Sequence, residues 1–93
     1  MTTTREEILK ALDGEEAYQL DRWADVQAVK DRHPHDRSLD EWIMYINRYA
    51  DMATAQTVHG QEEEALNVVR KVASLCFNCM RQYGAPQREG FER

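Results

Sequence analysis

A chain of 93 residues with a formal net charge of −5 lacks the excess of Lys and Arg with which nucleic-acid binders and membrane-surface proteins neutralise phosphate. Its content of 42% apolar and 31% charged residues is ordinary for a folded domain, and no apolar run approaches the roughly 20 residues that cross a bilayer or resembles a secretory signal. We therefore expect one cytoplasmic domain, residues 1–93, that binds neither nucleic acid nor membrane.

Breaks at Gly and Pro divide the sequence into three helical segments. The first is predicted at about residues 4–30. Thr4 and Glu7 have the spacing of a capping box, in which each side chain bonds the other residue's backbone N–H. Gly14 lies inside this segment and costs about 1 kcal/mol relative to Ala in a helix, which leaves open whether the helix is continuous there.

The second helix is predicted at about residues 39–58. Ser38 and Glu41 again have capping-box spacing. Apolar residues then recur every three or four positions from Trp42 to Ala53, which is the period of an amphipathic helix. Gly60 is expected to end the helix in a left-handed conformation.

The third helix is predicted at about residues 61–83, with a tail at 84–93. Three acids, Glu62–Glu64, stand at its start, where they favour the positive end of the helix dipole. Gly84 and Pro86 end it. Its apolar stripe consists of Ala65, Leu66, Val69, Val72, Ala73, Cys76, Cys79, Met80 and Tyr83.

This pattern predicts an all-α fold with a long antiparallel helical hairpin. The second and third helices are each about 30 Å long at 1.5 Å per residue, and so short a connection forces them to run antiparallel. The first helix is expected to cover part of the hairpin. Because so small a chain is marginally stable alone, we expect a homo-oligomer in which two hairpins form a helical bundle; the pattern does not separate a dimer from a tetramer.

Cys76 and Cys79 form a C-x-x-C pair. Three uses are open: packing in the core, a zinc site completed by His33, His35 or His59, and a redox pair. Redox pairs normally begin a helix, where the helix end stabilises the thiolate, and zinc needs two further ligands. Packing is favoured, because both cysteines fall on the apolar stripe.

A group of charged residues is the first candidate for ligand binding. The hairpin register brings Arg48 and Asp51 level with Arg70 and Lys71. Asp51 is then able to pair with Arg70 or Lys71 and to leave Arg48 as a free cation. One interpretation is a salt-bridge network; the other is a phosphate or carboxylate site, because Arg forms bidentate contacts with these groups.

Aromatic residues are concentrated in the first two helices. Most are expected to lie in the core or in an interface. Because binding clefts are often lined by aromatics, one or two are also candidates for stacking on a nucleobase. We add Trp23 and Tyr49 to the candidate ligand-binding residues for this reason.

Three stretches resemble a known family. Glu15–Trp23, Glu41–Ala55 and Ala65–Pro86, with its Gly-Ala-Pro exit, are similar to small phage and prophage proteins related to the all-α, MazG-like nucleoside triphosphate pyrophosphohydrolases. The likeness spans about residues 15–86. It implies the same helical scaffold and an origin in a phage or mobile element.

Active members of that superfamily hold Mg²⁺ with Glu-Glu-x-x-Glu on one helix and Glu-x-x-Asp on the next, because Mg²⁺ prefers hard oxygen ligands. The corresponding positions here are 48–52 and 68–71, where only Asp51 is acidic. The three cations Arg48, Arg70 and Lys71 outweigh this single carboxylate and would repel Mg²⁺. The resemblance therefore implies a scaffold that has lost the metal-dependent reaction and needs no cofactor.

Three hypotheses for the function follow from the sequence. The preferred one is a non-catalytic interaction or regulatory module that binds itself or a partner protein. The second is nucleotide binding by the basic cluster in place of the metal. The third is a divergent Mg²⁺-dependent pyrophosphatase that uses other acids, namely Asp40, Glu41, Asp51 and Glu64.

Overall fold

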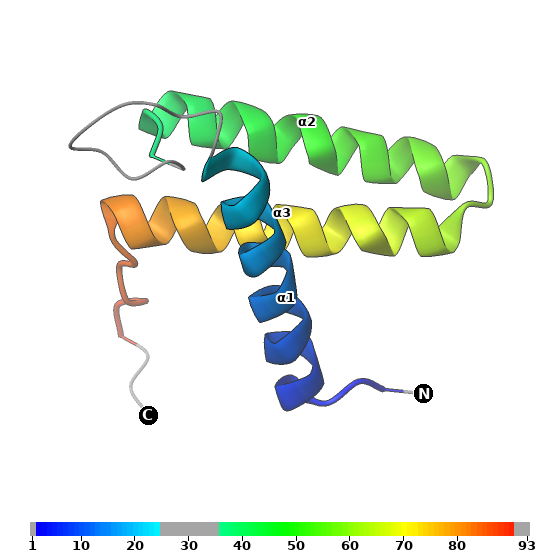
Figure 1. The fold of residues 1–93 in the computed structure, drawn as a ribbon, viewed down its shortest axis with the longest axis horizontal. Helices are drawn as coiled ribbons and strands as arrows, with labels where there is room; N and C mark the ends of the chain where they lie inside the picture. Colours follow the sequence, from blue (N-terminus) through cyan, green and yellow to red (C-terminus); the bar gives the residue numbers. More distant parts are fainter. Residues whose placement is uncertain (1, 25–35, 91–93) are drawn as a thin grey trace.

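The computed structural model describes residues 2–24 and 36–90, apart from the side chains of 20 and 22–24. Within these ranges the chain forms three helices and no strand: α1 (Arg5–Ala24), α2 (Leu39–Val58) and α3 (Glu62–Tyr83). Figure 1 shows α2 and α3 side by side and antiparallel, with α1 crossing α3. The predicted all-α hairpin is confirmed.

Helix α1 begins with the expected capping box. The Thr4 hydroxyl accepts a hydrogen bond from the Glu7 amide at 3.2 Å, and the Glu7 carboxylate accepts one from the Thr4 amide at 3.1 Å. The helix is continuous through Gly14. The predicted extension of this helix from 25 to 30 lies outside the described residues.

Both ends of α2 are closed as expected. Ser38 and Glu41 form a complete capping box. After the helix, the Gln61 amide donates to the Gln56 carbonyl at 2.8 Å and the Gly60 amide donates to the Thr57 carbonyl at 3.1 Å. These two bonds define a Schellman motif, and Gly60 takes the positive φ of 74° that the motif requires. The chain therefore reverses within three residues and starts α3 at Glu62.

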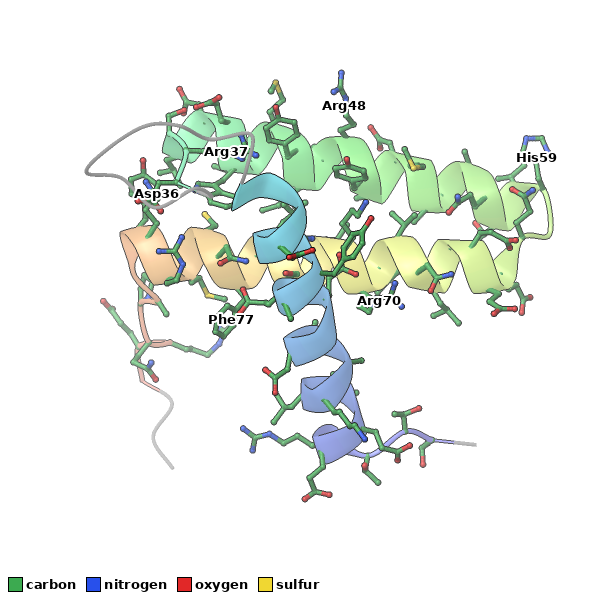
Figure 2. All side chains as sticks on the ribbon, in the orientation of Figure 1. Asp36, Arg37, Arg48, His59, Arg70 and Phe77 are labelled. Atoms are coloured by element: carbon green, nitrogen blue, oxygen red, sulfur yellow. The ribbon has the colours of Figure 1, made fainter. Side chains whose placement is uncertain are left out.

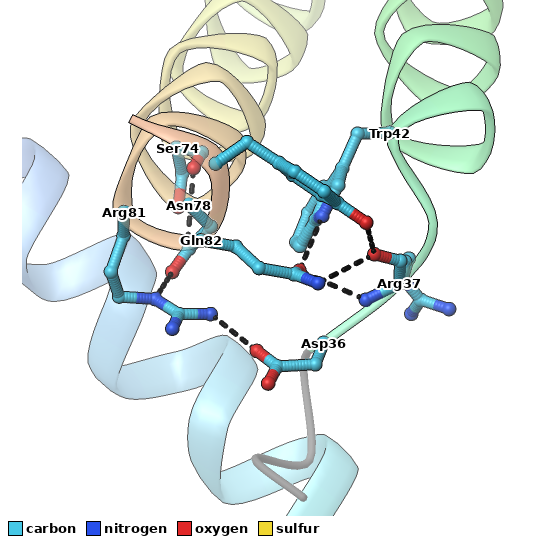
Figure 3. A network of polar contacts seen from close by, with 8 residues as sticks. Asp36, Arg37, Trp42, Ser74, Asn78, Arg81 and Gln82 are labelled. Carbon is cyan, nitrogen blue, oxygen red and sulfur yellow. Dashed lines mark hydrogen bonds and ion pairs between the residues drawn. The ribbon is translucent and has the colours of Figure 1, made fainter. Parts of the chain in front are cut away.

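A polar network at the other end of the hairpin ties the start of α2 to the end of α3 (Figure 3). The indole Nε1 of the fully buried Trp42 donates to Gln82 Oε1 at 2.8 Å. The same Gln82 amide donates to the Arg37 carbonyl at 2.7 Å and accepts from the Arg37 amide at 3.0 Å. The Tyr83 hydroxyl donates to that carbonyl at 2.9 Å. The buried indole is thus fixed at both its apolar and its polar end.

Helix α1 packs against the middle of α3. The buried residues of this junction are polar: Glu15 and Gln19 on α1, and Ser74 and Asn78 on α3. The N-terminal half of α1 extends beyond the hairpin (Figure 1). We find no helix among the described residues with the length and apolar content that a bilayer span requires.

Candidate functional site

A cleft of about 560 Å³ lies between α1 and α3. Its volume falls in the range of small-molecule sites. Its walls are formed by Ala11, Gly14, Glu15, Tyr18, Asn67, Val68, Arg70 and Lys71.

An ion pair crosses this cleft. Arg70 Nε donates to Glu15 Oε1 at 2.9 Å, and the Glu15 side chain is 5% exposed against 41% for Arg70. The second carboxylate oxygen of Glu15 accepts from Gln19 Nε2 at 2.9 Å, and Arg70 Nη1 donates to Asn67 at 2.8 Å. The buried charge of Glu15 is therefore neutralised by Arg70, as a buried carboxylate requires.

The expected pairing of Asp51 with Arg70 or Lys71 is wrong. Asp51 is exposed, and the ion pairs formed among the described residues do not include it. The reason is rotation about the helix axis: Tyr49 faces α3, and Asp51, two residues on, is turned about 200° from it. Arg48 is also exposed and points away from α3 (Figure 2). The register placed both residues at the correct level but on the wrong side of α2.

Lys71 and Tyr49 do come together across the hairpin. Lys71 Nζ lies 5.0 Å from the centroid of the half-buried Tyr49 ring, within the range of a cation–π contact. Trp23 belongs to α1, but its side chain lies outside the part of the chain that the structure describes. Arg70 and Lys71 thus line the cleft, with Tyr49 in contact with Lys71.

Glu15 and Tyr18 were not among the ligand-binding residues chosen from the sequence. A signal for Glu15 was present, because Ile8, Leu12, Glu15 and Gln19 follow one another at spacings of four, three and four and so share one side of α1. Two polar residues that continue an apolar line indicate a buried polar contact rather than a solvated surface.

The cysteines are half-buried, free thiols on α3. Burial, and then the neighbouring Cys79, raise the pKa of the Cys76 thiol, whereas reactive thiols have a lowered pKa. In residues 2–24 and 36–90 no three side chains of His, Cys, Asp or Glu gather into a possible metal site. His33 and His35 lie outside those ranges.

The four acids considered for a magnesium site are spread along the hairpin. Asp40 and Glu41 stand at the start of α2, Asp51 stands in its middle, and Glu64 stands at the start of α3, which antiparallel packing puts at the opposite end. They therefore do not form one coordination site.

A second candidate surface runs along the hairpin. On α3 the residues at 66, 69, 73, 76, 80 and 83 alternate spacings of three and four, the heptad pattern of a helix that packs against another helix. Leu66 is 66% exposed, and Val69, Met80 and Tyr83 are about half exposed. On α2, Leu39 and Ile43 are exposed in the same way. We call these six large residues, Leu39, Ile43, Leu66, Val69, Met80 and Tyr83, the open face.

Helix geometry places the open face on one side of the hairpin. Gln82, which contacts α2, and Arg70, which contacts Glu15 of α1, lie about 120° apart around this helix. The positions 66, 69, 73, 76 and 80 occupy a third side, at 100° per residue. In the antiparallel α2 the positions of Leu39 and Ile43 turn toward the same side. The open face therefore lies away from α1.

The chain matches no family model, and neither a curated protein nor a solved structure is significantly similar to it. The resemblance to MazG-like proteins consequently stays a prediction that rests on the residues quoted for it.

Proposed function

We propose that this protein is a non-catalytic interaction module that pairs with a second copy of itself through the open face. The observation that carries the proposal is the heptad series of large apolar residues that α3 leaves exposed. Single exposed apolar residues are common on monomers, but contiguous apolar patches indicate interaction sites.

The exposed area fits a dimer. One chain exposes 7747 Å², whereas a compact monomer of 10.9 kDa exposes about 5,600 Å². The difference of roughly 2,000 Å² reflects an extended chain, and it leaves room for the share of about 1,000 Å² that each partner buries in the smaller obligate homodimers. The radius of gyration of 15.1 Å is likewise above the roughly 12 Å of a compact domain of this length.

The chemistry of the open face favours a second copy as its occupant. None of the six heptad positions on α3 carries a charge, so a two-fold axis that sets this surface against itself opposes no like charges. Two hairpins paired in this way would form a four-helix bundle, a common way to bury such stripes.

Molar mass measured by light scattering after gel filtration tests the proposal with two matched variants. Val69→Asp puts a charge into the open face, and Met44→Asp puts the same charge on an exposed part of α2 that is turned about 100° from Ile43. We expect dimers for the original chain and for Met44→Asp, and monomers for Val69→Asp. A monomeric original chain, or a dimeric Val69→Asp variant, would contradict the proposal.

A second candidate function is binding of a nucleotide in the α1–α3 cleft. Two cations, Arg70 and Lys71, and the half-exposed ring of Tyr18 favour it. Because Glu15 neutralises Arg70, Lys71 supplies the remaining positive charge. Calorimetric titration with a nucleoside triphosphate tests this function: heat of binding in EDTA that Lys71→Gln abolishes would support it, and no heat with either Mg²⁺ or EDTA would exclude it.

A further inference from the structure

The N-terminal half of α1 carries an apolar surface that the described residues cover only in part. Glu15 and Gln19 are buried against α3, while Ile8 is 49% exposed and Leu12 is half-buried. All four lie on one side of α1, since they are separated by four, three and four residues. Ile8 and Leu12 therefore lie on the same side of α1 as the buried pair, in the N-terminal half of the helix, which extends beyond the hairpin (Figure 1).

This overhang, which we define by Ile8 and Leu12, gains little from packing within one chain, since Ile8 is 49% exposed. Two or three turns of helix that pack on nothing are marginal in water, and α1 is held to α3 farther along its length, by Glu15. A capping box at Thr4 nevertheless closes the outer end of the helix. The apolar side of this end is explained if something packs beneath it.

Phe77 connects the overhang to the open face. It is about half exposed and projects from α3 on the side away from α2, beside α1 (Figure 2). Leu66 of the open face lies on nearly the same side of α3, because eleven residues complete about three turns. A molecule that covers the open face and reaches around the edge of α3 would therefore meet Phe77 and then the overhang.

We propose that the overhang packs on the second copy of the chain and closes over the edge of its hairpin. This inference rests on the dimer proposed above. A second copy is the occupant already proposed for the open face, and one chain exposes about 2,000 Å² more surface than a compact monomer of its mass. Under two-fold symmetry each chain holds the other with its own α1, and the overhang contributes to dimer affinity as well as to the fold of its own chain.

Sedimentation equilibrium of matched variants tests the inference. Ile8→Gln removes the apolar contact, and Lys10→Gln makes the same substitution about 200° around the same turn. We expect Ile8→Gln to raise the dimer Kd about tenfold, as expected for a residue that anchors an interface, and Lys10→Gln to leave Kd within about twofold, since surface substitutions away from contacts have small effects. Equal Kd values for the two variants would overturn the inference and leave the dimer intact; a monomeric original chain would overturn both.

A second measurement keeps the inference testable if Ile8→Gln disturbs α1 itself. In a dimer mixed from differently isotope-labelled chains, filtered NOE spectra show only contacts between chains. We expect such contacts from the Ile8 methyl groups as well as from Val69. Contacts between chains from Val69 without any from Ile8 would show a dimer in which the overhang is not used.

Discussion

The two helix junctions of this molecule bury different kinds of side chain, apolar in one and polar in the other. Where α2 meets α3, the apolar indole of Trp42 is buried and a glutamine satisfies its single N–H. Where α1 meets α3, the buried side chains are Glu15, Gln19, Ser74 and Asn78. Apolar burial stabilises without regard to direction, whereas a buried polar contact holds only in one geometry and is costly when a partner is lost. We therefore expect the hairpin to supply most of the stability, and the polar contacts to fix the position of α1 on α3.

The polar junction also contains an unsatisfied group. Ser74 is 0% exposed, and its hydroxyl makes no hydrogen bond within the described residues. Its neighbour Asn78 is satisfied by the Ser74 carbonyl at 3.0 Å and by Arg81 Nε at 3.2 Å. A buried hydroxyl without a partner weakens the docking of α1. The hairpin contains one such atom as well, Gln56 Oε1 on α2, which makes no hydrogen bond within the described residues.

The largest effect is expected from Trp42→Ala. Removing the buried ring leaves a cavity and should lower the free energy of unfolding by about 3–5 kcal/mol. Chemical unfolding at one fixed protein concentration measures this loss. Met44→Ala, an exposed position on the same helix, should change stability by less than about 0.5 kcal/mol. Equal losses for the two variants would mean that Trp42 does not hold the hairpin.

Arg70→Ala should act on α1 and spare the hairpin. It leaves the buried carboxylate of Glu15 without its cation and should cost about 1–3 kcal/mol. Amide hydrogen exchange should accelerate in α1 and stay near its original rate in α2. Arg48→Ala, which removes an exposed arginine of α2, is the control and should change neither rate. Faster exchange spread equally over α2 would contradict a separate α1 junction.

The two capping boxes allow the same substitution at both junctions. Ser38→Ala removes the cap of α2 and should lower global stability by about 1 kcal/mol. Thr4→Ala should lower it less, because the first turn of α1 frays without opening the hairpin. Thermal unfolding compares the two variants. A larger loss for Thr4→Ala would reverse the proposed order of stability.

The smallest effect concerns pH at the start of α1. Hydrogen bonds from the Thr4 backbone and then from its side chain lower the pKa of Glu7 below its ordinary value of 4.5. Because the folded pKa is the lower one, the stabilisation is complete above pH 4.5 and is lost as pH falls through the folded pKa. Carbon NMR of the Glu7 carboxylate should show this titration, and Thr4→Val should move it toward 4.5. A Glu7 pKa at or above 4.5 would contradict a stabilising contact between Thr4 and the Glu7 carboxylate.

The sequence was informative where apolar period and caps agree. Trp42 to Ala53 supplied the period of α2, and Ser38 and Gly60 supplied its ends, so the hairpin was predictable. The position of α1 was not, because the line from Ile8 to Gln19 indicates which side of α1 packs but not which part of α3 it packs on. The pairing expected for Asp51 was wrong for a related reason: counting from the turn gives the level of Asp51 along α2, while its side depends on rotation about the helix.

We propose that a second copy covers the open face, and the molar mass of the unmodified chain in solution decides whether it does. Sedimentation equilibrium across a range of protein concentrations should give twice the 10.9 kDa of one chain, with dissociation only on dilution. A mass of one chain at every concentration, with the helices intact by circular dichroism, would contradict the account.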